Sequence, residues 1–185
     1  MQYHVNGFNP GDPDVQPATQ GHRRTGDPLP ATVDVLIAGT GPAGLCLAAQ
    51  LARVPTIRTL VVEPKLGPME KGQADGISVR SMEMFQAFGF AEKFMRESVW
   101  INETTFWAPG TEAALDRVAR VQDVPDGTSE MPHVLINQAR VHDMYLDIMR
   151  NSPTRLEPDY GLKVLDLKID STATEYPVTV TLEHT

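Results

Sequence analysis

The chain has 185 residues, of which 41% are hydrophobic and 22% charged, values typical of an ordinary globular domain. Its formal net charge of −8 offers no basic surface for nucleic acid or anionic lipid, so we expect neither as a partner. The single cysteine, Cys46, excludes a disulfide framework, and no residue spacing indicates a metal site. The absence of a recognisable signal peptide or membrane-spanning stretch predicts a cytoplasmic protein.

The first elements along the chain predict a βαβ unit that follows an extended arm. Residues 1–32 are rich in proline and glycine and predict an extended N-terminal arm. Residues 33–38 (VDVLIA) and 58–63 (RTLVVE) are short apolar runs that predict two buried parallel strands. Between them, apolar residues recur at helical spacing: Leu45, Ala48, Ala49 and Ala52.

A glycine motif stands at the first turn of this unit. Gly39, Gly41 and Gly44 match the dinucleotide fingerprint, in which the glycines allow a tight turn, close approach of a pyrophosphate and close packing of helix on strand. Pro42 favours the start of a helix, whose free N–H groups attract an anion. Glu63 ends the second strand, where a carboxylate can accept hydrogen bonds from a ribose. The motif therefore predicts dinucleotide binding.

The next segment predicts turns followed by an amphipathic helix. Gly72 and the pair Asp75-Gly76 are typical of turns, and the helical pattern starts at Ile77 and stops at Gly89. The side chains expected to face inward are Met84, Phe85 and Phe88.

Residues 98–137 have a strand-like texture. Residues 104–108 and 133–137 predict strands separated by a polar loop, and we interpret them as the start of an inserted sheet. A helix over 139–150 follows, with His142 expected in solvent and an apolar stripe formed by Val141, Met144, Tyr145 and Ile148. The alternation of Leu165, Leu167 and Ile169, and later of Val178, Val180 and Leu182, predicts a closing hairpin.

Three motifs carry a resemblance to a known family. GPAGL (41–45), VVE (61–63) and GQADGISVRSMEMF (72–85) together resemble the phenol hydroxylase branch of the class A flavoprotein monooxygenases, and the likeness covers nearly the whole chain. It implies an α/β, Rossmann-like FAD-binding fold of the p-hydroxybenzoate hydroxylase type, present here only in part. In that interpretation the segments are an N-terminal arm (1–32), an FAD-binding βαβ unit with helices (33–97), the first strands of a substrate-binding sheet (98–137) and a return to the FAD-binding domain (138–185).

The resemblance also implies the chemistry. Members of the family bind FAD non-covalently, reduce it with NADPH and use O2 to hydroxylate a phenol beside its oxygen. The implied substrate is a phenolic acid such as 3-hydroxybenzoate, hydroxylated ortho to its hydroxyl to give 3,4-dihydroxybenzoate; phenol itself is the alternative. The residues assigned to FAD are Gly39, Gly41, Pro42, Ala43, Gly44, Glu63, Pro64, Gln73, Ala74, Arg80 and Gln138.

Two residues are candidates for the substrate side. Asp75 matches the family's active-site aspartate, and a carboxylate beside a phenol can orient or accept its proton; the alternative is a plain Asp-Gly turn. The imidazole of His133 can donate a hydrogen bond to a substrate carboxylate or phenol oxygen. Its alternative role is that of a partly exposed histidine that satisfies a neighbouring carbonyl.

The sequence departs from the family pattern at its end. The second and third FAD motifs, most of the substrate sheet and the C-terminal domain are missing, so we expect a fragment that needs the missing C-terminal part as its partner and binds FAD poorly alone. A homodimer is left open. The alternative from another class is a truncated, non-catalytic flavin-binding remnant.

Overall fold

The computed structural model describes residues 11, 12, 14–110 and 114–185. It divides into two compact units, one formed by Met1–Glu70 with Val141–Thr185 and the other by Lys71–Arg140. Residues 1–10 of the expected arm lie outside the described residues. The division by function predicted above, with a substrate-binding sheet over 98–137, stays a prediction. No helix among the described residues is long and apolar enough to cross a lipid bilayer.

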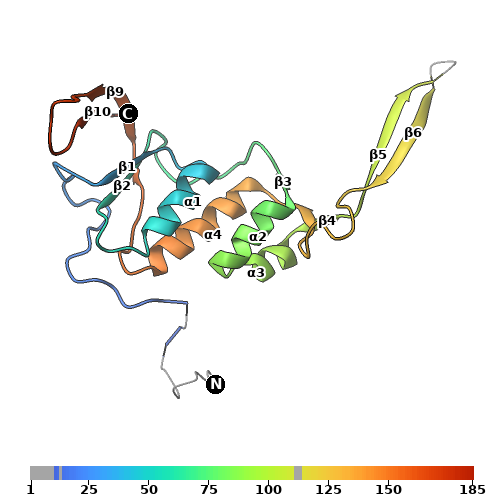
Figure 1. The fold of residues 1–185 in the computed structure, drawn as a ribbon, viewed down its shortest axis with the longest axis horizontal. Helices are drawn as coiled ribbons and strands as arrows, with labels where there is room; N and C mark the ends of the chain where they lie inside the picture. The colour runs from blue at the N-terminus through green and yellow to red at the C-terminus, as the bar shows by residue number, and fades with distance from the viewer. Residues whose placement is uncertain (1–10, 13, 111–113) are drawn as a thin grey trace. The chain divides into compact units, whose positions relative to one another are not determined.

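The first unit is built on a parallel sheet with the order β1-β2-β8, and Figure 1 labels β1 and β2 of this sheet. Strands β1 (Val35–Ala38) and β2 (Thr59–Glu63) are joined through helix α1 (Pro42–Leu51), and β8 (Asp159–Tyr160) pairs with the end of β2. The predicted strand, helix, strand order is therefore confirmed. The helical apolar stripe packs as expected, since the four residues with no exposed surface on this segment are Leu45, Ala48, Ala49 and Ala52.

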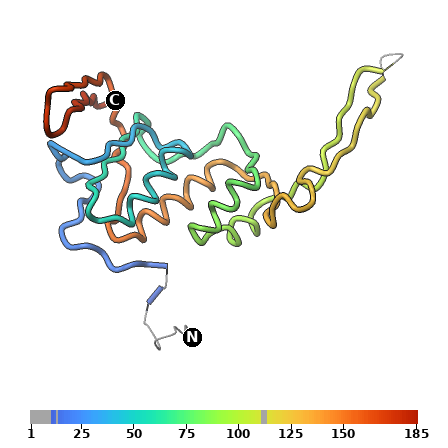
Figure 2. Tube along the Cα trace, in the orientation of Figure 1, coloured from blue at the N-terminus to red at the C-terminus, as the bar shows by residue number. Residues whose placement is uncertain are grey.

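A β-hairpin closes the chain in this unit. Strands β9 (Leu162–Ile169) and β10 (Val178–His184) run antiparallel side by side, which Figure 2 shows as adjacent traces, and this confirms the predicted hairpin. Leu162 is buried in a cluster with Leu60 and Val62 of the sheet. The alternating residues of β9 stay exposed, with Leu165 at 52%, Leu167 at 54% and Ile169 at 71%, whereas Val180 and Leu182 of β10 are half-buried.

Helix α4 (Gln138–Asn151) has a wider buried face than the sequence predicted. Val141, Met144 and Tyr145 are buried as expected, but Leu146 and Met149 are buried too, whereas Ile148 is only half-buried. The expectation that His142 is solvated is wrong, because its side chain is only 3% exposed. The predicted buried face was too narrow. His142, Tyr145, Leu146 and Met149 recur at three- and four-residue spacing, and so lie on one helix face.

The second unit combines two helices with a small antiparallel sheet. Helices α2 (Val79–Phe88) and α3 (Ala91–Glu97) pack through aromatic rings, with the Phe85 centroid 4.7 Å from Phe90 and 4.9 Å from Phe94. The sheet has the order β3-β7-β4, with β3 at Gly76–Ile77, β7 at His133–Leu135 and β4 at Val99–Ile101. The aromatic cluster therefore provides the core of this unit.

The structure contradicts two predictions for this unit, the Asp75-Gly76 turn and the burial of Met84, and confirms others. Asp75-Gly76 is not a turn, because Gly76 pairs with Leu135 in the β3–β7 ladder and the Ile136 N–H donates to the Asp75 carbonyl. Met82, not Met84, is the buried methionine of α2, whereas Phe85 and Phe88 are buried as predicted. Gly89 ends α2 with a φ of 91°, the left-handed C-cap that glycine favours.

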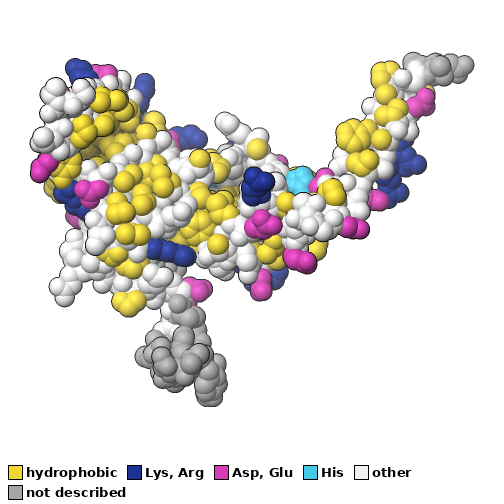
Figure 3. Space-filling model, viewed as in Figure 1, with side chains coloured by type: hydrophobic (Ala, Val, Ile, Leu, Met, Phe, Trp, Pro, Cys, Tyr) yellow, Lys and Arg dark blue, Asp and Glu magenta, His cyan; other side chains and the backbone are white. Residues whose placement is uncertain are grey.

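Between β4 and β7 the chain forms a two-stranded ribbon instead of the polar loop alone. Strands β5 (Glu103–Pro109) and β6 (Leu115–Gln122) pair antiparallel, with a register shift between Phe106 and Trp107. Figure 3 shows hydrophobic side chains on the surface of the ribbon, and Phe106 and Trp107 are 51% and 59% exposed. The sequence did not predict strand β6, because both of its faces are largely exposed to solvent and carry charged as well as apolar residues.

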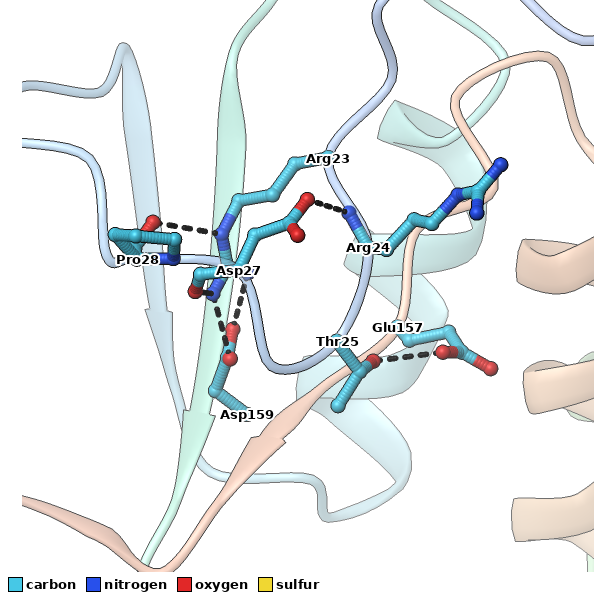
Figure 4. Close-up of polar contacts among 7 residues, drawn as sticks. All are labelled: Arg23, Arg24, Thr25, Asp27, Pro28, Glu157 and Asp159. Carbon is cyan, nitrogen blue, oxygen red and sulfur yellow. Dashed lines mark hydrogen bonds and ion pairs between the residues drawn. The ribbon is translucent and has the colours of Figure 1, made fainter.

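The described part of the N-terminal arm has no helix or strand, and is fastened to the first unit by side chains (Figure 4). The Arg23 guanidinium donates to both carboxylate oxygens of Asp159, at 2.6 and 2.8 Å, and Asp159 is 8% exposed. Thr25 adds a 2.6 Å hydrogen bond to Glu157. The bonds to Asp159 raise the pKa of Arg23, so this pair stays charged and anchors the arm beside β8.

Breaking this anchor should destabilise the first unit. Arg23→Ala leaves the Asp159 carboxylate without its bidentate partner, so we expect the free energy of unfolding to fall by about 2 kcal/mol. Arg24→Ala is the matched control, because no side-chain bond of Arg24 is formed within the described residues, and it should change stability by less than about 0.5 kcal/mol. Urea unfolding followed by circular dichroism measures both, and equal midpoints would contradict the anchoring role.

Candidate functional site

The glycine turn after β1 is set by one close approach. Gly39 has a φ of 101°, which turns the chain from the strand toward the helix, and its N–H donates to the Val62 carbonyl at 2.8 Å. A Cβ on Gly44 would lie 2.2 Å from the Gly39 carbonyl oxygen. Helix and strand therefore pack more closely than any side chain at Gly44 permits.

The start of α1 is open to a ligand. Gly41 is the N-cap, a Cβ placed on it would meet no atom within 4 Å, and no side chain caps the helix. Pro42 occupies the first helical position, and residues 41–43 are exposed. Unfilled backbone donors and the positive end of the helix dipole suit a phosphate group. The shape of the turn thus fits a pyrophosphate, with Gly41 as the place of nearest approach.

Glu63 at the end of β2 is held beside the turn. One oxygen of its carboxylate accepts hydrogen bonds from the Thr40 N–H at 2.8 Å and the Thr40 hydroxyl at 2.9 Å, and the other accepts from the Lys65 N–H at 3.1 Å. Burial by itself raises the pKa of Glu63, but these bonds outweigh it and lower the pKa overall. The carboxylate is therefore ionised at neutral pH, and its second oxygen keeps a lone pair for a ribose hydroxyl.

His142 belongs to the surroundings of this turn, which the sequence did not suggest. The Met69 N–H donates to its Nε2 at 3.4 Å, and burial lowers the pKa of the imidazole, opposed in part by Asp143 and the Thr40 backbone. His142 of α4 thus packs, as a neutral side chain, against the segment that follows β2. The helical spacing with Tyr145 and Met149 was the signal that marks it as buried.

In the second unit the structure brings Gln73 and Gln138 together. The Gln73 N–H donates to the Gln138 side-chain carbonyl at 2.9 Å, and a Cβ on Gly72 would lie 2.4 Å from the Gln138 Cβ. Gly72 is therefore needed for this contact, which fixes the loop before β3. The remaining residues that the resemblance assigns to FAD are exposed and make no side-chain bond within the described residues: Ala43, Pro64, Ala74 and Arg80.

Asp75 and His133 lie at or next to two paired strands of the same small sheet. Asp75 immediately precedes β3, and its exposed carboxylate has no hydrogen-bond partner among the described residues. His133 begins β7, the strand that pairs with β3, and a Cβ on Gly76 would lie 3.5 Å from its Nε2. The strand pairing thus brings the imidazole next to the residue that follows Asp75.

The partner of His133 is Asp123, which the sequence did not single out. The His133 Nδ1 lies 2.6 Å from a carboxylate oxygen of Asp123, and the Thr104 hydroxyl donates to the other oxygen at 3.0 Å. The alternative expectation holds in part: the His133 side chain is partly exposed, at 31%, but the neighbour that it contacts is a carboxylate and not a carbonyl. Sequence spacing gave no signal for this pair, because ten residues and a turn separate the two side chains.

Comparison with known proteins identifies the family. The family model described as an FAD binding domain matches residues 32–172. The chain therefore belongs to the FAD binding domain family, and FAD is its cofactor. When bound, FAD supplies the redox chemistry of such proteins.

One curated relative spans this whole chain. The chain is 59% identical to the 3-hydroxybenzoate 4-monooxygenase of Comamonas testosteroni over 186 residues, which is 100% of this chain but only 29% of that enzyme. The chain thus corresponds to less than a third of the length of this relative.

Solved structures share the fold. The p-nitrophenol 4-monooxygenase PnpA from Pseudomonas putida DLL-E4 superposes with a TM-score of 0.68 at 19% identity, over 82% of this chain and 36% of that one. The flavin-dependent monooxygenase PieE, solved in complex with FAD and substrate, gives 0.65 at 22% identity, over 83% and 27%. The predicted Rossmann-like FAD-binding fold, present in part, is confirmed.

Alanine substitutions of Gly44 and Gly41 should have different effects. We consider a chimera that joins residues 1–185 to the remaining, C-terminal part of the Comamonas testosteroni enzyme. In it, Gly44→Ala should destabilise the fold by about 1 to 3 kcal/mol, because its Cβ collides with the Gly39 carbonyl. Gly41→Ala should leave stability unchanged but weaken FAD binding at least roughly tenfold, because its Cβ takes the space of the pyrophosphate.

Thermal unfolding without FAD and fluorescence titration with FAD separate the two effects. Full FAD affinity in Gly41→Ala would show that the pyrophosphate does not approach this turn.

Proposed function

We propose that this chain is the N-terminal, FAD-binding part of an NADPH-using monooxygenase that hydroxylates a phenolic acid. The substrate we infer is 3-hydroxybenzoate, which receives a hydroxyl group ortho to its own and becomes 3,4-dihydroxybenzoate. The observation that carries this proposal is the 59% identity to 3-hydroxybenzoate 4-monooxygenase along the entire chain.

We assign the pyrophosphate and ribose of FAD to residues of the first unit. Gly39, Gly41 and Gly44 shape the turn for the pyrophosphate, with Pro42 and Ala43 in the first turn of α1, and Glu63 accepts the ribose hydroxyls. We assign Pro64, Gln73, Ala74, Arg80 and Gln138 to other parts of FAD. The bond between Gln73 and Gln138 supports their joint assignment, because it holds both in one place.

Asp75 is the residue we assign to the phenol. FAD, when bound, would supply the oxygenating chemistry after reduction by NADPH, and attack on the ring is easier when the phenol proton is withdrawn. The Asp75 carboxylate is exposed and unbonded within the described residues, so it is available to accept that proton. The electron density released onto the ring is greatest ortho and para to the oxygen, which agrees with hydroxylation beside it.

His133 is the residue we assign to the substrate carboxylate. Its Nδ1 is occupied by Asp123, while the side chain is 31% exposed and its Nε2 lies beside Gly76. A histidine that can carry positive charge favours a phenolic acid over phenol itself. His133→Phe should therefore weaken binding of 3-hydroxybenzoate by roughly tenfold or more, and unchanged affinity, measured by the flavin absorbance change, would remove His133 from the site.

The proposed activity requires protein beyond this chain. Apolar side chains are exposed in both units, among them Leu167 and Ile169 on the hairpin and Trp107 on the ribbon. The C-terminal part of the enzyme is the partner we expect to cover such surfaces. Mixing the chain with that part, or joining them in the chimera, should give bound yellow flavin and NADPH oxidation stimulated by 3-hydroxybenzoate. Flavin binding without stimulated oxidation would favour a non-catalytic flavin-binding remnant.

Asp75→Asn tests the catalytic assignment in the chimera. We expect FAD affinity to stay within about twofold, because the Asp75 side chain makes no hydrogen bond within the described residues. Hydroxylation of 3-hydroxybenzoate should fall at least roughly tenfold, because the amide cannot take up the phenol proton. Product formation is measured by chromatography. Asp126→Asn is the control, because the Asp126 carboxylate accepts a hydrogen bond from the Gln122 side chain. Unchanged turnover in Asp75→Asn removes Asp75 from the mechanism.

A further inference from the structure

The buried imidazole of His142 has a defined proton position. The residue is 3% exposed, and its Nε2 is bonded to the Met69 N–H at 3.4 Å. A backbone N–H can only donate, so Nε2 is the acceptor in this bond. In a neutral ring the single proton then lies on Nδ1. The contact with Met69 therefore selects one of the two neutral tautomers of His142.

The other ring nitrogen lies close to the glycine turn. Nδ1 is buried and makes no hydrogen bond within the described residues. The Thr40 backbone favours the protonated ring, as a carbonyl oxygen near an imidazole N–H does. Thr40 is also the residue whose N–H and hydroxyl hold Glu63. His142 thus packs next to the residue that fixes the proposed ribose acceptor.

The charged groups that act on the imidazole come from α4, from β2 and from the segment after β2. Asp143 of α4 and Glu63 of β2 favour the protonated ring, whereas Lys65 disfavours it. Burial has the largest effect, and the pKa of His142 is lowered overall. The ring is therefore neutral at neutral pH, which agrees with Nε2 as an acceptor.

Protonation of His142 is incompatible with this packing. A proton on Nε2 would point at the Met69 N–H, so that two donors would face each other beside a buried positive charge. The segment after β2 must therefore move away before the ring can be protonated. This segment contains Pro64, which we assign to FAD, and Lys65, whose N–H donates to the Glu63 carboxylate. Its displacement thus disturbs the group proposed to bind the ribose.

We propose that His142 is a positioning residue of the FAD site, which holds the segment after β2 in place as a neutral imidazole and weakens FAD binding when it is protonated. The proposal rests on the proposed binding of FAD at the glycine turn, and adds a dependence on pH to it. His142 acts through Met69 and Thr40, without touching the cofactor.

FAD affinity of the chimera should therefore fall in acid. Bound FAD keeps the segment in place, so the complex takes up a proton on His142 less readily than the free protein does. Because the pKa of His142 in the free protein is below the ordinary value of about 6.5, affinity is complete above that pH and falls below it. We expect the dissociation constant for FAD, measured by fluorescence titration, to rise at least roughly threefold from pH 7.5 to pH 5.0. Glu63 stays largely ionised over this range, because its pKa is lowered too.

His142→Gln in the chimera separates titration from packing. Glutamine can accept from the Met69 N–H and donate through its amide, but it does not titrate. We expect the pH dependence of FAD affinity to shrink to less than about twofold between the same two pH values. His184→Gln is the matched control, because His184 is exposed on β10, and it should keep the full dependence.

An FAD affinity of the unmodified chimera that does not change with pH, or a dependence that survives His142→Gln, would overturn the proposal. A chimera that binds no FAD at either pH would instead overturn the proposed function.

A measurement on the chain itself needs neither FAD nor a substitution. Proton–nitrogen correlation spectra of the imidazole rings distinguish the two neutral tautomers of histidine and follow the protonation of each ring. His142 should carry its proton on Nδ1 at pH 7.5, and should protonate at a lower pH than the exposed His184. A proton on Nε2, or protonation of both rings at the same pH, would contradict the positioning role.

Discussion

The close packing of α1 on β1 is the constraint on which the cofactor side of this protein depends. Because Gly44 has no side chain, the helix approaches the Gly39 carbonyl directly, and its first turn begins at the end of the strand. The free N–H groups of that turn then lie beside Thr40, whose N–H and hydroxyl hold Glu63. One steric condition therefore places both groups proposed to bind FAD, the free N–H groups of the helix start and the Glu63 carboxylate.

The surroundings of the turn preserve this geometry. His142 from α4 is buried against the segment after β2, and Tyr145 on the same helix hydrogen-bonds with Cys46 of α1, while burial raises the pKa of the tyrosine. On the other side of the first unit, the pair of Arg23 and Asp159 fixes the arm beside β8. A site that binds an extended dinucleotide needs such support, because its donors belong to the backbone and move with it.

The chemistry of the second unit depends on strand pairing instead of a helix start. Strand β3 has only two residues, and its ladder with β7 is supported by α2 and by the rings of Phe85, Phe90 and Phe94. The pairing brings His133 beside Gly76. Asp123, which directly follows strand β6 of the ribbon, lies within hydrogen-bonding distance of His133. Asp75 thus directly precedes one of the two paired strands and His133 begins the other, while the carboxylate bonded to His133 comes from a third segment.

The sequence by itself determined the βαβ unit, its glycine turn, the hairpin and the family, because each is a local pattern: spacing of glycines, period of apolar residues and motif order. It misjudged His142, Met84 and the Asp75-Gly76 pair, whose burial and pairing depend on elements far along the chain. It gave no sign of Asp123, since a hydrogen bond between side chains on separate strands has no sequence period. Only the tertiary structure, by pairing β3 with β7 and folding the ribbon back to His133, decided which carboxylate meets the imidazole.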